Sequence, residues 1–357
     1  MENKAVWLLG KQNIKIDTAP MPVPKPDEVV IKVGYVGICG SDMHFYETGN
    51  YSKGPIVDPL ILGHECAGTV VAAGEDVKNL AVGDNVAVEP GETCGQCEYC
   101  LGGRYNLCKS VRFKSVPPFH GVMRNYVAHS AERCFKLPDN VSLLEGALIE
   151  PFAIGLYAVE RAEVKKGDTV VILGTGCIGM MTLLAAKAMG AGKIIAVDLY
   201  DSRLEKAKSL GADEIINSAK EDCAERVMEI TDGAGADVVF EAAGSKATLT
   251  MAPGLCKSGG IIMMVGNIYD PVTFNFWSIN HREIEIRSIY RYCNTFPKAI
   301  SMVASKEVNL LPLVTDTYDF GDAEEAFKSS ILNKVDTLKC VIKINSDLQE
   351  ESDESQA

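Results

Sequence analysis

The sequence predicts two domains of different class: a mostly β domain at the start of the chain, and an α/β domain with a doubly wound parallel sheet after it. Two observations lead to this prediction. The 357 residues exceed the roughly 100 to 200 that one domain usually holds. Near residue 155 the pattern also changes, from short β-rich runs between turn residues to apolar runs that alternate with helix-compatible segments.

The β-rich runs of the first part are separated by Gly, Pro and Asp, and helical periodicity is scarce among them. They occupy residues 28–33, 68–71, 85–88 and 124–127. Short runs between turn residues are typical of a compact β domain.

The second part carries four apolar, strand-like runs at residues 169–173, 193–197, 237–240 and 260–265. Helix-compatible segments such as 178–189 and 202–210 lie between the first three runs. Strands that alternate with helices imply right-handed crossovers, which produce a parallel sheet. The pattern alone does not place the chain after about residue 292. Residues 346–357 are polar and acidic, and we expect a frayed tail.

The composition excludes several functional classes. With 47% hydrophobic and 23% charged residues and a mean hydropathy of +0.06, the chain is globular rather than disordered. The 35 basic and 48 acidic residues give a net charge of −13, which disfavours nucleic acid and anionic membrane surfaces as partners. Residues 169–186 are uncharged and approach the length of a membrane span, but their glycines argue against one.

The twelve cysteines are more consistent with metal binding than with disulfides. The chain opens MENKAVWLLGKQNIKI, which lacks the apolar stretch and cleavage site of a secretory signal. We therefore expect a cytoplasmic protein, in a compartment that keeps thiols reduced.

A glycine-rich motif, Gly174-Thr-Gly176-Cys-Ile-Gly179, follows the first strand of the second domain and opens a helix. The first glycine permits a tight turn, the second lets the backbone approach a pyrophosphate, and the third lets helix and strand pack closely. The helix N-terminus offers free N–H groups to phosphates. This context predicts a dinucleotide site rather than an unliganded turn.

Asp198 ends the next strand, where a carboxylate accepts the ribose hydroxyls of the dinucleotide. A carboxylate there repels a 2′-phosphate, so we expect NAD rather than NADP. Arg203 lies nearby and would favour such a phosphate, but it can also pack along the adenosine or pair with the acid.

Four cysteines at short spacing, Cys94, Cys97, Cys100 and Cys108, lie in a segment rich in Gly and Glu that has little apolar content of its own. Four thiolates at this spacing favour a closed, tetrahedral structural zinc site. An iron–sulfur cluster remains open from the ligand types alone.

A second, dispersed set of candidate metal ligands consists of Cys39, His64, Glu65 and Glu150. One thiolate, one imidazole and one or two carboxylates leave a coordination position open, as catalytic zinc requires. Each residue also has an ordinary structural interpretation, as a core cysteine, a turn histidine or a helix-end acid.

Together these motifs resemble the medium-chain zinc-dependent alcohol dehydrogenases. Gly63-His64-Glu65-x2-Gly68-x5-Gly74 is similar to the zinc signature of that family and occurs beside GICGSD, the four cysteines and the glycine motif. GICGSDMHFYE, VPPFHG, ALIEPFAIG and RYCNTFPKAISMVASKEVNLLPLVT resemble its polyol dehydrogenases, the sorbitol (L-iditol) and xylitol group. The resemblance covers about residues 1–345.

The resemblance implies a Rossmann domain, residues 153–292, inserted into a GroES-like catalytic domain formed by residues 1–152 and 293–345. It implies an active site in the cleft, a catalytic zinc, a structural zinc in a lobe at residues 91–110, and a homotetramer. Animal sorbitol dehydrogenases typically lack the complete four-cysteine lobe, which this chain keeps. Phe119-His120 also stands where animal relatives carry acidic residues.

Carried over by position, the resemblance assigns site residues as follows. Cys39, His64 and Glu65 would bind the catalytic zinc, and Glu150 would bind it directly or through water; which glutamate is the ligand stays open. Ser41 and His44 would relay the proton, with ordinary helix-start capping as the alternative. The residues that would contact the polyol are Tyr46, Arg291 and Tyr292. Those that would contact the cofactor include Ile178, Asp198, Arg203, Val265, Gly266, Asn267, Ile289, Tyr290 and Arg291.

The expected function is the reversible, zinc- and NAD-dependent oxidation of a secondary hydroxyl of a polyol to a ketose. Two alternatives remain: an L-threonine or 2,3-butanediol dehydrogenase on the same fold, and a catalytically silent protein that binds NAD and zinc. The sequence does not determine the polyol, its stereochemistry or the direction of the reaction.

Overall fold

The computed structural model describes residues 2–51 and 54–345, which form two compact units. One unit consists of the chain up to Glu150 together with the chain from Phe296, and the other is Pro151–Thr295. These divisions lie two and three residues from the boundaries predicted at 152/153 and 292/293. The predicted acidic tail, 346–357, lies outside the described residues.

The first unit is built on a mixed sheet whose central strand is β3. β3 pairs antiparallel with β7, β11 and β20, so the last strand of the chain lies beside one of the first. The sheet comprises β3 (Glu28–Gly37), β7 (Glu65–Ala73), β8 (Asn85–Val88), β11 (Tyr126–Ser130), β12 (Cys134–Lys136), β19 (Val314–Asp319) and β20 (Lys339–Lys343). The predicted runs 28–33, 68–71 and 85–88 lie within β3, β7 and β8.

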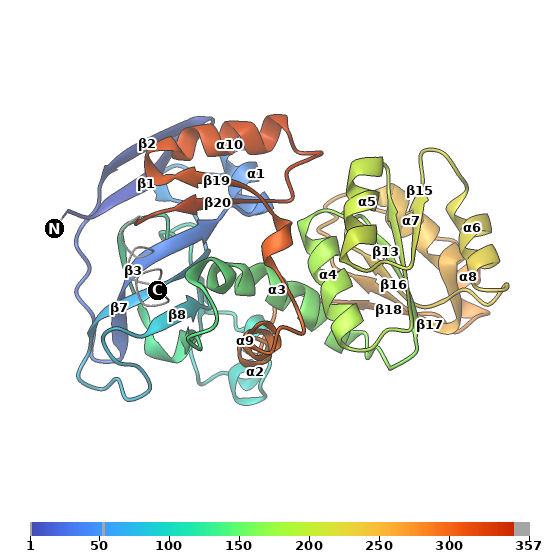
Figure 1. The fold of residues 1–357 in the computed structure, drawn as a ribbon, viewed down its shortest axis with the longest axis horizontal. Coiled ribbons are helices and arrows are strands. Elements are labelled where there is room, and N and C mark those ends of the chain that lie inside the picture. Colours follow the sequence, from blue (N-terminus) through green and yellow to red (C-terminus); the bar gives the residue numbers. More distant parts are fainter. Residues whose placement is uncertain (1, 52–53, 346–357) are drawn as a thin grey trace. The chain divides into compact units, whose positions relative to one another are not determined.

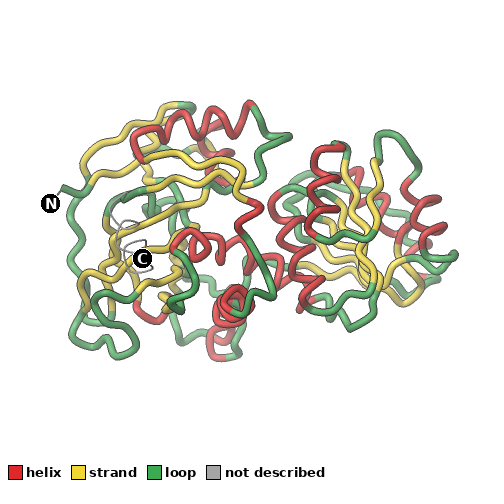
Figure 2. Tube along the Cα trace, in the orientation of Figure 1, coloured by secondary structure: helices red, strands yellow, loops and turns green. Residues whose placement is uncertain are grey.

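Smaller elements complete this unit (Figures 1 and 2). α10 packs on β19, β20 and α1, and buried Val, Ile and Leu side chains of β1, β3, β7 and β8 form the core. These elements are β1 (Lys4–Gly10), β2 (Asn13–Thr18), α1 (Gly40–Thr48), β4 (Asn50–Tyr51), β5 (Gly54–Pro55), β6 (Leu60–Ile61), β9 (Gly91–Glu92), α2 (Glu98–Leu101), β10 (Arg112–Phe113), α9 (Phe296–Ala304) and α10 (Ala323–Leu332).

The second unit contains a six-stranded parallel sheet with the strand order β15-β14-β13-β16-β17-β18. The strands are β13 (Thr169–Leu173), β14 (Lys193–Asp198), β15 (Glu214–Asn217), β16 (Ala236–Glu241), β17 (Cys256–Met264) and β18 (Glu285–Ser288). The order reverses between β13 and β16, which is the switch point of a doubly wound sheet. The predicted parallel sheet is confirmed.

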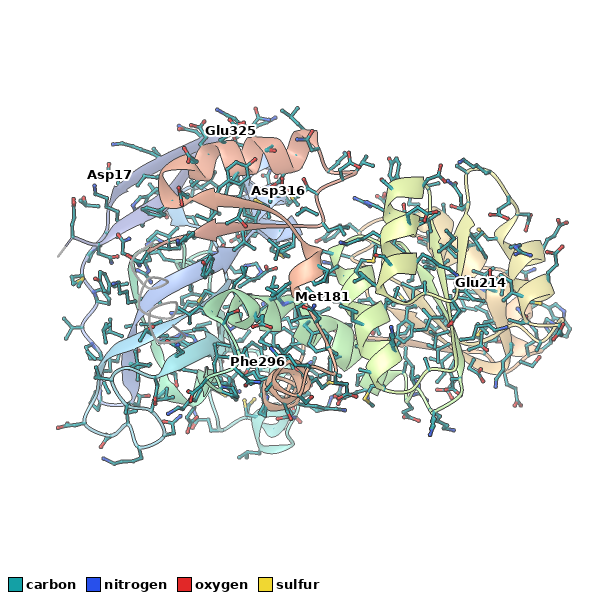
Figure 3. All side chains as sticks on the ribbon, viewed as in Figure 1. Asp17, Met181, Glu214, Phe296, Asp316 and Glu325 are labelled. Atoms are coloured by element: carbon teal, nitrogen blue, oxygen red, sulfur yellow. The ribbon has the colours of Figure 1, made fainter. Side chains whose placement is uncertain are left out.

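Helices connect these strands: α4 (Cys177–Ala188), α5 (Asp201–Leu210), α6 (Cys223–Ile230), α7 (Lys246–Leu255) and α8 (Trp277–Asn280). α4 contacts α5, whereas α7 contacts α6 and α8. The uncharged stretch 169–186 is β13, the glycine turn and most of α4, whose Met181 is wholly buried (Figure 3). Among the described residues, no helix combines the length and the apolar character that crossing a membrane requires.

Candidate metal centres and nucleotide site

The first candidate site gathers a thiol, an imidazole and a carboxylate in the first unit. One ligand atom each from Cys39, His64 and Glu65 lies within 4.8 Å of the other two. Cys39 is the residue before α1, His64 lies in the loop before β7, and Glu65 begins that strand. Sulfur, nitrogen and oxygen donors at this separation fit a zinc ion.

The turn at Gly63 explains how two successive residues reach one site. Side chains of neighbouring residues in a strand point to opposite faces, so His64 and Glu65 cannot converge from a regular strand. Gly63 has φ +87°, a conformation that glycine adopts readily. A Cβ atom at Gly63 would lie 2.6 Å from Cγ of Met123, so the position also has no room for a side chain.

Asp42 joins the segments that carry these ligands. Its carboxylate is wholly buried and accepts hydrogen bonds from the backbone N–H of Cys39 (3.2 Å) and of Gly63 (3.1 Å). It also accepts one from the Ser115 hydroxyl (2.9 Å) and lies 3.7 Å from Nδ1 of His64. Asp42 thus fixes the start of α1 against the turn before β7.

Glu65 forms a buried ion pair with Lys339 of β20. Nζ of Lys339 lies 2.9 and 2.8 Å from the two carboxylate oxygens, and the residues are 1% and 3% exposed. Lys339 also donates to the carbonyl oxygen of Ile38 (3.1 Å). Each carboxylate oxygen has two acceptor positions, so this pair leaves Glu65 able to bind a cation.

Glu150, on α3 (Leu143–Arg161), is buried but does not belong to the compact ligand cluster found among the described residues. Burial lowers the pKa of His64, but the negative charges of Asp42, Cys39 and Glu150 outweigh that effect and raise it well above its ordinary value. The surroundings therefore favour a positive charge at the cluster, as a metal ion supplies.

The other residues predicted around this site occupy different environments. Ser41 and His44, the expected proton relay, are both exposed on α1. Tyr46 is 3% exposed, and its ring lies 5.4 Å from that of Phe327, so much of this side chain belongs to the core.

The four-cysteine segment brings its sulfur atoms together around one point. The Sγ–Sγ distances are 3.9 Å between Cys94 and Cys100, 3.5 Å between Cys97 and Cys100, and 3.5 Å between Cys108 and Cys94. A single tetrahedral zinc with Zn–S bonds of about 2.3 Å separates its sulfurs by about 3.8 Å. Several irons and sulfides would need more space, so the geometry favours one ion.

The local backbone prepares these thiols for a metal. N–H groups of Gln96 and Cys97 point at the Cys94 sulfur and lower the pKa of its thiol to about 6. Because thiolates are the ligands of zinc, this fits a metal site. None of the twelve cysteines, all of which lie in the described residues, forms a disulfide; of the seven outside the two clusters, six are buried and Cys177 is partly exposed.

The nucleotide motif lies at the carboxyl end of β13, at the switch point of the sheet. Gly174 has φ +91° and makes the turn, and Gly176 precedes the first turn of α4. A Cβ atom at Gly179 would collide with the carbonyl oxygen of Gly174, whereas one at Gly176 would meet only Arg203, at 3.9 Å. The backbone of Gly176 is therefore open to a close ligand, as the approach of a pyrophosphate requires.

Asp198 ends β14 and binds the glycine turn. One of its oxygens accepts hydrogen bonds from the backbone N–H (2.7 Å) and hydroxyl (2.9 Å) of Thr175, and the other accepts from the N–H groups of Leu199 and Tyr200. Nη1 of Arg203 lies 4.0 Å from the carboxylate. Asp198 thus holds the turn as well as placing a negative charge beside it.

The remaining predicted cofactor residues follow other strands of the same sheet. Val265, Gly266 and Asn267 follow β17, and Ile289, Tyr290 and Arg291 follow β18. Carboxyl ends of parallel strands share one edge of the sheet, so these segments lie on the edge that bears the glycine motif. The Arg291 guanidinium lies 4.9 Å above the Tyr290 ring, and Tyr292 is 3% exposed.

Comparison with known proteins agrees with this arrangement. The alcohol dehydrogenase GroES-like domain matches residues 25–139, and the zinc-binding dehydrogenase domain matches residues 177–305. Sorbitol dehydrogenase from Bacillus subtilis is 43% identical over 340 residues, which cover 95% of this chain and 96% of that protein. The chain belongs to the zinc-dependent medium-chain alcohol dehydrogenases. It is therefore an oxidoreductase that acts on CH–OH groups.

Solved structures of other members have the same fold. An Escherichia coli oxidoreductase/dehydrogenase of unknown specificity has a TM-score of 0.94 and 45% identity, covering 97% of this chain and 100% of its own. The 2R,3R-butanediol dehydrogenase from Bacillus subtilis has a TM-score of 0.88 and 32% identity, covering 96% and 100%. The fold prediction, a Rossmann-type domain with a GroES-like domain, is confirmed.

Three residues of this dehydrogenase's sites were not predicted from the sequence. Asp42 carried a signal, because an acid three residues after a helix N-cap is typical of a capping box. Glu241 accepts hydrogen bonds from the N–H groups of Ala243 and Gly244 and so shapes the turn after β16. Lys339 carried little signal, since its partner Glu65 is 274 residues away.

Proposed function

We propose that this protein is a zinc- and NAD-dependent polyol dehydrogenase that reversibly oxidises a secondary hydroxyl to a ketone. The observation that carries the proposal is the Cys39, His64 and Glu65 cluster, which combines zinc-ligand chemistry with a buried, negatively charged setting. The similarity to sorbitol dehydrogenase supports a polyol as substrate.

Cys39, His64 and Glu65 would hold the catalytic zinc, with Glu150 beside it as a direct or water-mediated contact. When bound, zinc would supply Lewis-acid chemistry toward a substrate hydroxyl, and NAD would supply the hydride acceptor. Cys94, Cys97, Cys100 and Cys108 would hold a second, structural zinc. Metal analysis of the purified protein should find about two zinc ions per chain.

In this proposal Ser41 and His44 carry the proton away from the substrate hydroxyl. Both side chains are exposed, so the imidazole can exchange protons with water. Arg291 binds the remaining polyol hydroxyls, and Tyr46 and Tyr292 limit the space available to the substrate. Full turnover by Ser41→Ala at neutral pH would exclude the relay.

Gly176 and Ile178 would contact the cofactor at the turn that Gly174 and Gly179 shape, and Asp198 would bind the ribose, which favours NAD over NADP. Replacing Asp198 with Asn removes the charge that repels a 2′-phosphate. We expect the ratio of kcat/KM for NAD to that for NADP to fall by roughly tenfold. An unchanged ratio would mean that Asp198 does not select the cofactor.

The experiment that tests the function is a substrate panel followed by NADH formation: sorbitol, xylitol, ribitol, galactitol, L-threonine, 2,3-butanediol and ethanol. A polyol should be the best substrate and ethanol a poor one. The likeness to butanediol dehydrogenase supports a vicinal diol as the second candidate. Absence of turnover with every substrate by zinc-replete protein would support a silent binding protein instead. The homotetrameric assembly stays a prediction, which a mass measurement by light scattering tests. The cytoplasmic location also stays a prediction.

A further inference from the structure

A second concave site lies in the first unit, beside β10. A cavity of about 280 Å³ is lined by Glu92, Arg112, Lys114, His120 and Arg124, with Pro118 and Phe119 completing its wall. Its volume is close to the lower end of small-molecule pockets, which begins at about 300 Å³. Cys39, His64 and Glu65 do not line it.

The one acidic side chain of this cavity already has partners. One oxygen of Glu92 accepts hydrogen bonds from Nη2 (2.5 Å) and Nε (3.1 Å) of Arg112. Its other oxygen lies 3.2 Å from Nδ1 of His129. The charge of Glu92 is therefore balanced by Arg112.

Lys114 and Arg124 lack such a direct partner among the described residues, although the negative charge of Glu92 also acts on Lys114 and favours its charged form. Within residues 2–51 and 54–345, neither has a carboxylate oxygen within 4.0 Å, and Lys114 donates only to the carbonyl oxygen of Ala128, at 3.4 Å. Nε of Arg124 is buried and has no hydrogen-bond partner in this part of the chain. Both residues are partly buried, and cations withdrawn from water in proteins are ordinarily paired, because desolvation is costly.

Burial lowers the pKa of Lys114, and it lowers that of Arg124 to about 10, so Arg124 stays charged at neutral pH. His120, exposed at the rim, adds a neutral donor. Its Nδ1 accepts a hydrogen bond from the N–H of Ile61 (3.3 Å), so in the neutral imidazole the proton resides on Nε2. With one carboxylate and three cationic side chains, the cavity lining carries a formal net charge of +2, and His120 adds one N–H donor.

We propose that this cavity binds a phosphate group. A phosphate carries a charge of about −1.5 to −2 at pH 7 and three strong acceptor oxygens, which match two cations and an imidazole N–H. A single carboxylate would offset only half of the formal charge of +2. The phosphate belongs either to inorganic phosphate or to a phosphorylated metabolite. The proposal does not depend on the polyol reaction, because no ligand of the metal cluster takes part.

The binding test is equilibrium dialysis of the zinc-loaded full chain against inorganic phosphate. Lys114→Gln and Arg124→Gln should each raise the dissociation constant of phosphate at the cavity site by roughly tenfold or more, because each removes a charged donor. Lys136→Gln is the matched control, since Lys136 is exposed and pairs with Asp84. Phosphate bound at the metal cluster or the glycine turn is unaffected by these changes. Equal affinity in wild type and both variants would overturn the proposal.

A second measurement needs no variant and so is independent of folding defects. The NMR resonance of His120 in wild type reports its pKa, which phosphate in the cavity should raise, because an adjacent anion favours the charged imidazole. Chloride at equal ionic strength should not raise it. The absence of a phosphate-specific shift at saturation would contradict binding at this site.

The same dialysis distinguishes the two sources of phosphate. Labelled inorganic phosphate is displaced by either unlabelled sorbitol 6-phosphate or unlabelled inorganic phosphate. If sorbitol 6-phosphate is effective at the lower concentration, the cavity serves a phosphorylated metabolite. If the two compete equally, inorganic phosphate is sufficient. Both outcomes support a phosphate site, whereas failure of sorbitol 6-phosphate to compete at any concentration would restrict the site to the free ion.

Discussion

The two clusters of candidate metal ligands in the first unit are built in opposite ways. The sulfurs of Cys94, Cys97, Cys100 and Cys108 come from fifteen consecutive residues, most of which are exposed or half-exposed. Cys39 and the successive residues His64 and Glu65 come from two separate segments, and Asp42 and Lys339 add buried charges around them. The first cluster depends on local backbone geometry, and the second on packing of distant strands.

This difference indicates different duties. A segment without an apolar core gains stability from a metal that joins its ends, so loss of that metal should affect folding first. A cluster that is already fixed by buried hydrogen bonds does not need the metal for its shape and can leave a coordination position open for chemistry. Replacing residues of each cluster, one at a time, tests this contrast.

The largest expected effect is on activity, from Cys39→Ser. Loss of the thiolate ligand should reduce kcat/KM by at least roughly a thousandfold, because the Lewis acid is lost. The midpoint of thermal unfolding should change little, and zinc content should fall by about one ion per chain. A thermal midpoint that falls as far as in lobe variants would break the proposed contrast.

Lys339→Met should have the largest effect on stability. It leaves the buried carboxylate of Glu65 without its cation, which costs about 3–5 kcal/mol of unfolding free energy when nothing replaces it. Bound zinc compensates part of that charge, so denaturant unfolding should show a larger loss in metal-free than in zinc-loaded protein. Lys343→Met, on the same strand, is the control. An equal loss with and without zinc would argue against Glu65 as a ligand.

Cys100→Ser should act mainly on folding. We expect the thermal midpoint of the zinc-loaded protein to fall by roughly 4 °C or more, as a loss of about 2 kcal/mol produces in a unit of this size. The activity of the protein that remains folded should fall less than tenfold. Scanning calorimetry with parallel rate measurements checks both. A near-complete loss of activity at an unchanged midpoint would reverse the assignment of the two clusters.

Asp42→Asn should have the smallest effect, because the amide keeps the shape of the side chain and one acceptor oxygen. Hydrogen bonds to a charged group are worth about 1.5–3 kcal/mol, and the amide keeps those made to one oxygen, so we expect a loss of less than about 1.5 kcal/mol in unfolding free energy. Zinc affinity of the Cys39 cluster should fall while that of the lobe stays the same. Asp17→Asn, at an exposed position (Figure 3), is the control. Equal loss of zinc from both clusters would mean that Asp42 acts through general stability.

The second unit could be predicted more completely than the first. The four inner strands of its sheet are largely buried and appear in the sequence as apolar runs, and the predicted run 169–173 coincides with β13. The edge strands β15 and β18 carry charged residues and were not among the predicted runs. In the first unit β4, β5, β6, β9 and β10 have only two residues each and left no periodicity to detect. α1 was also missed as an element, because nine residues of mixed character carry no clear apolar stripe.

The sequence by itself determined the order of the elements, the glycine turn and the four-cysteine segment, because each depends on interactions over a few residues. Tertiary structure decided what surrounds them. Antiparallel pairing of β20 with β3 brings Lys339 to Glu65, and the turn at Gly63 brings His64 to Cys39. It also places Lys114 and Arg124 in one cavity whose lining carries more positive than negative side chains. Such contacts arise from chain packing across long separations, which spacing along the sequence does not encode.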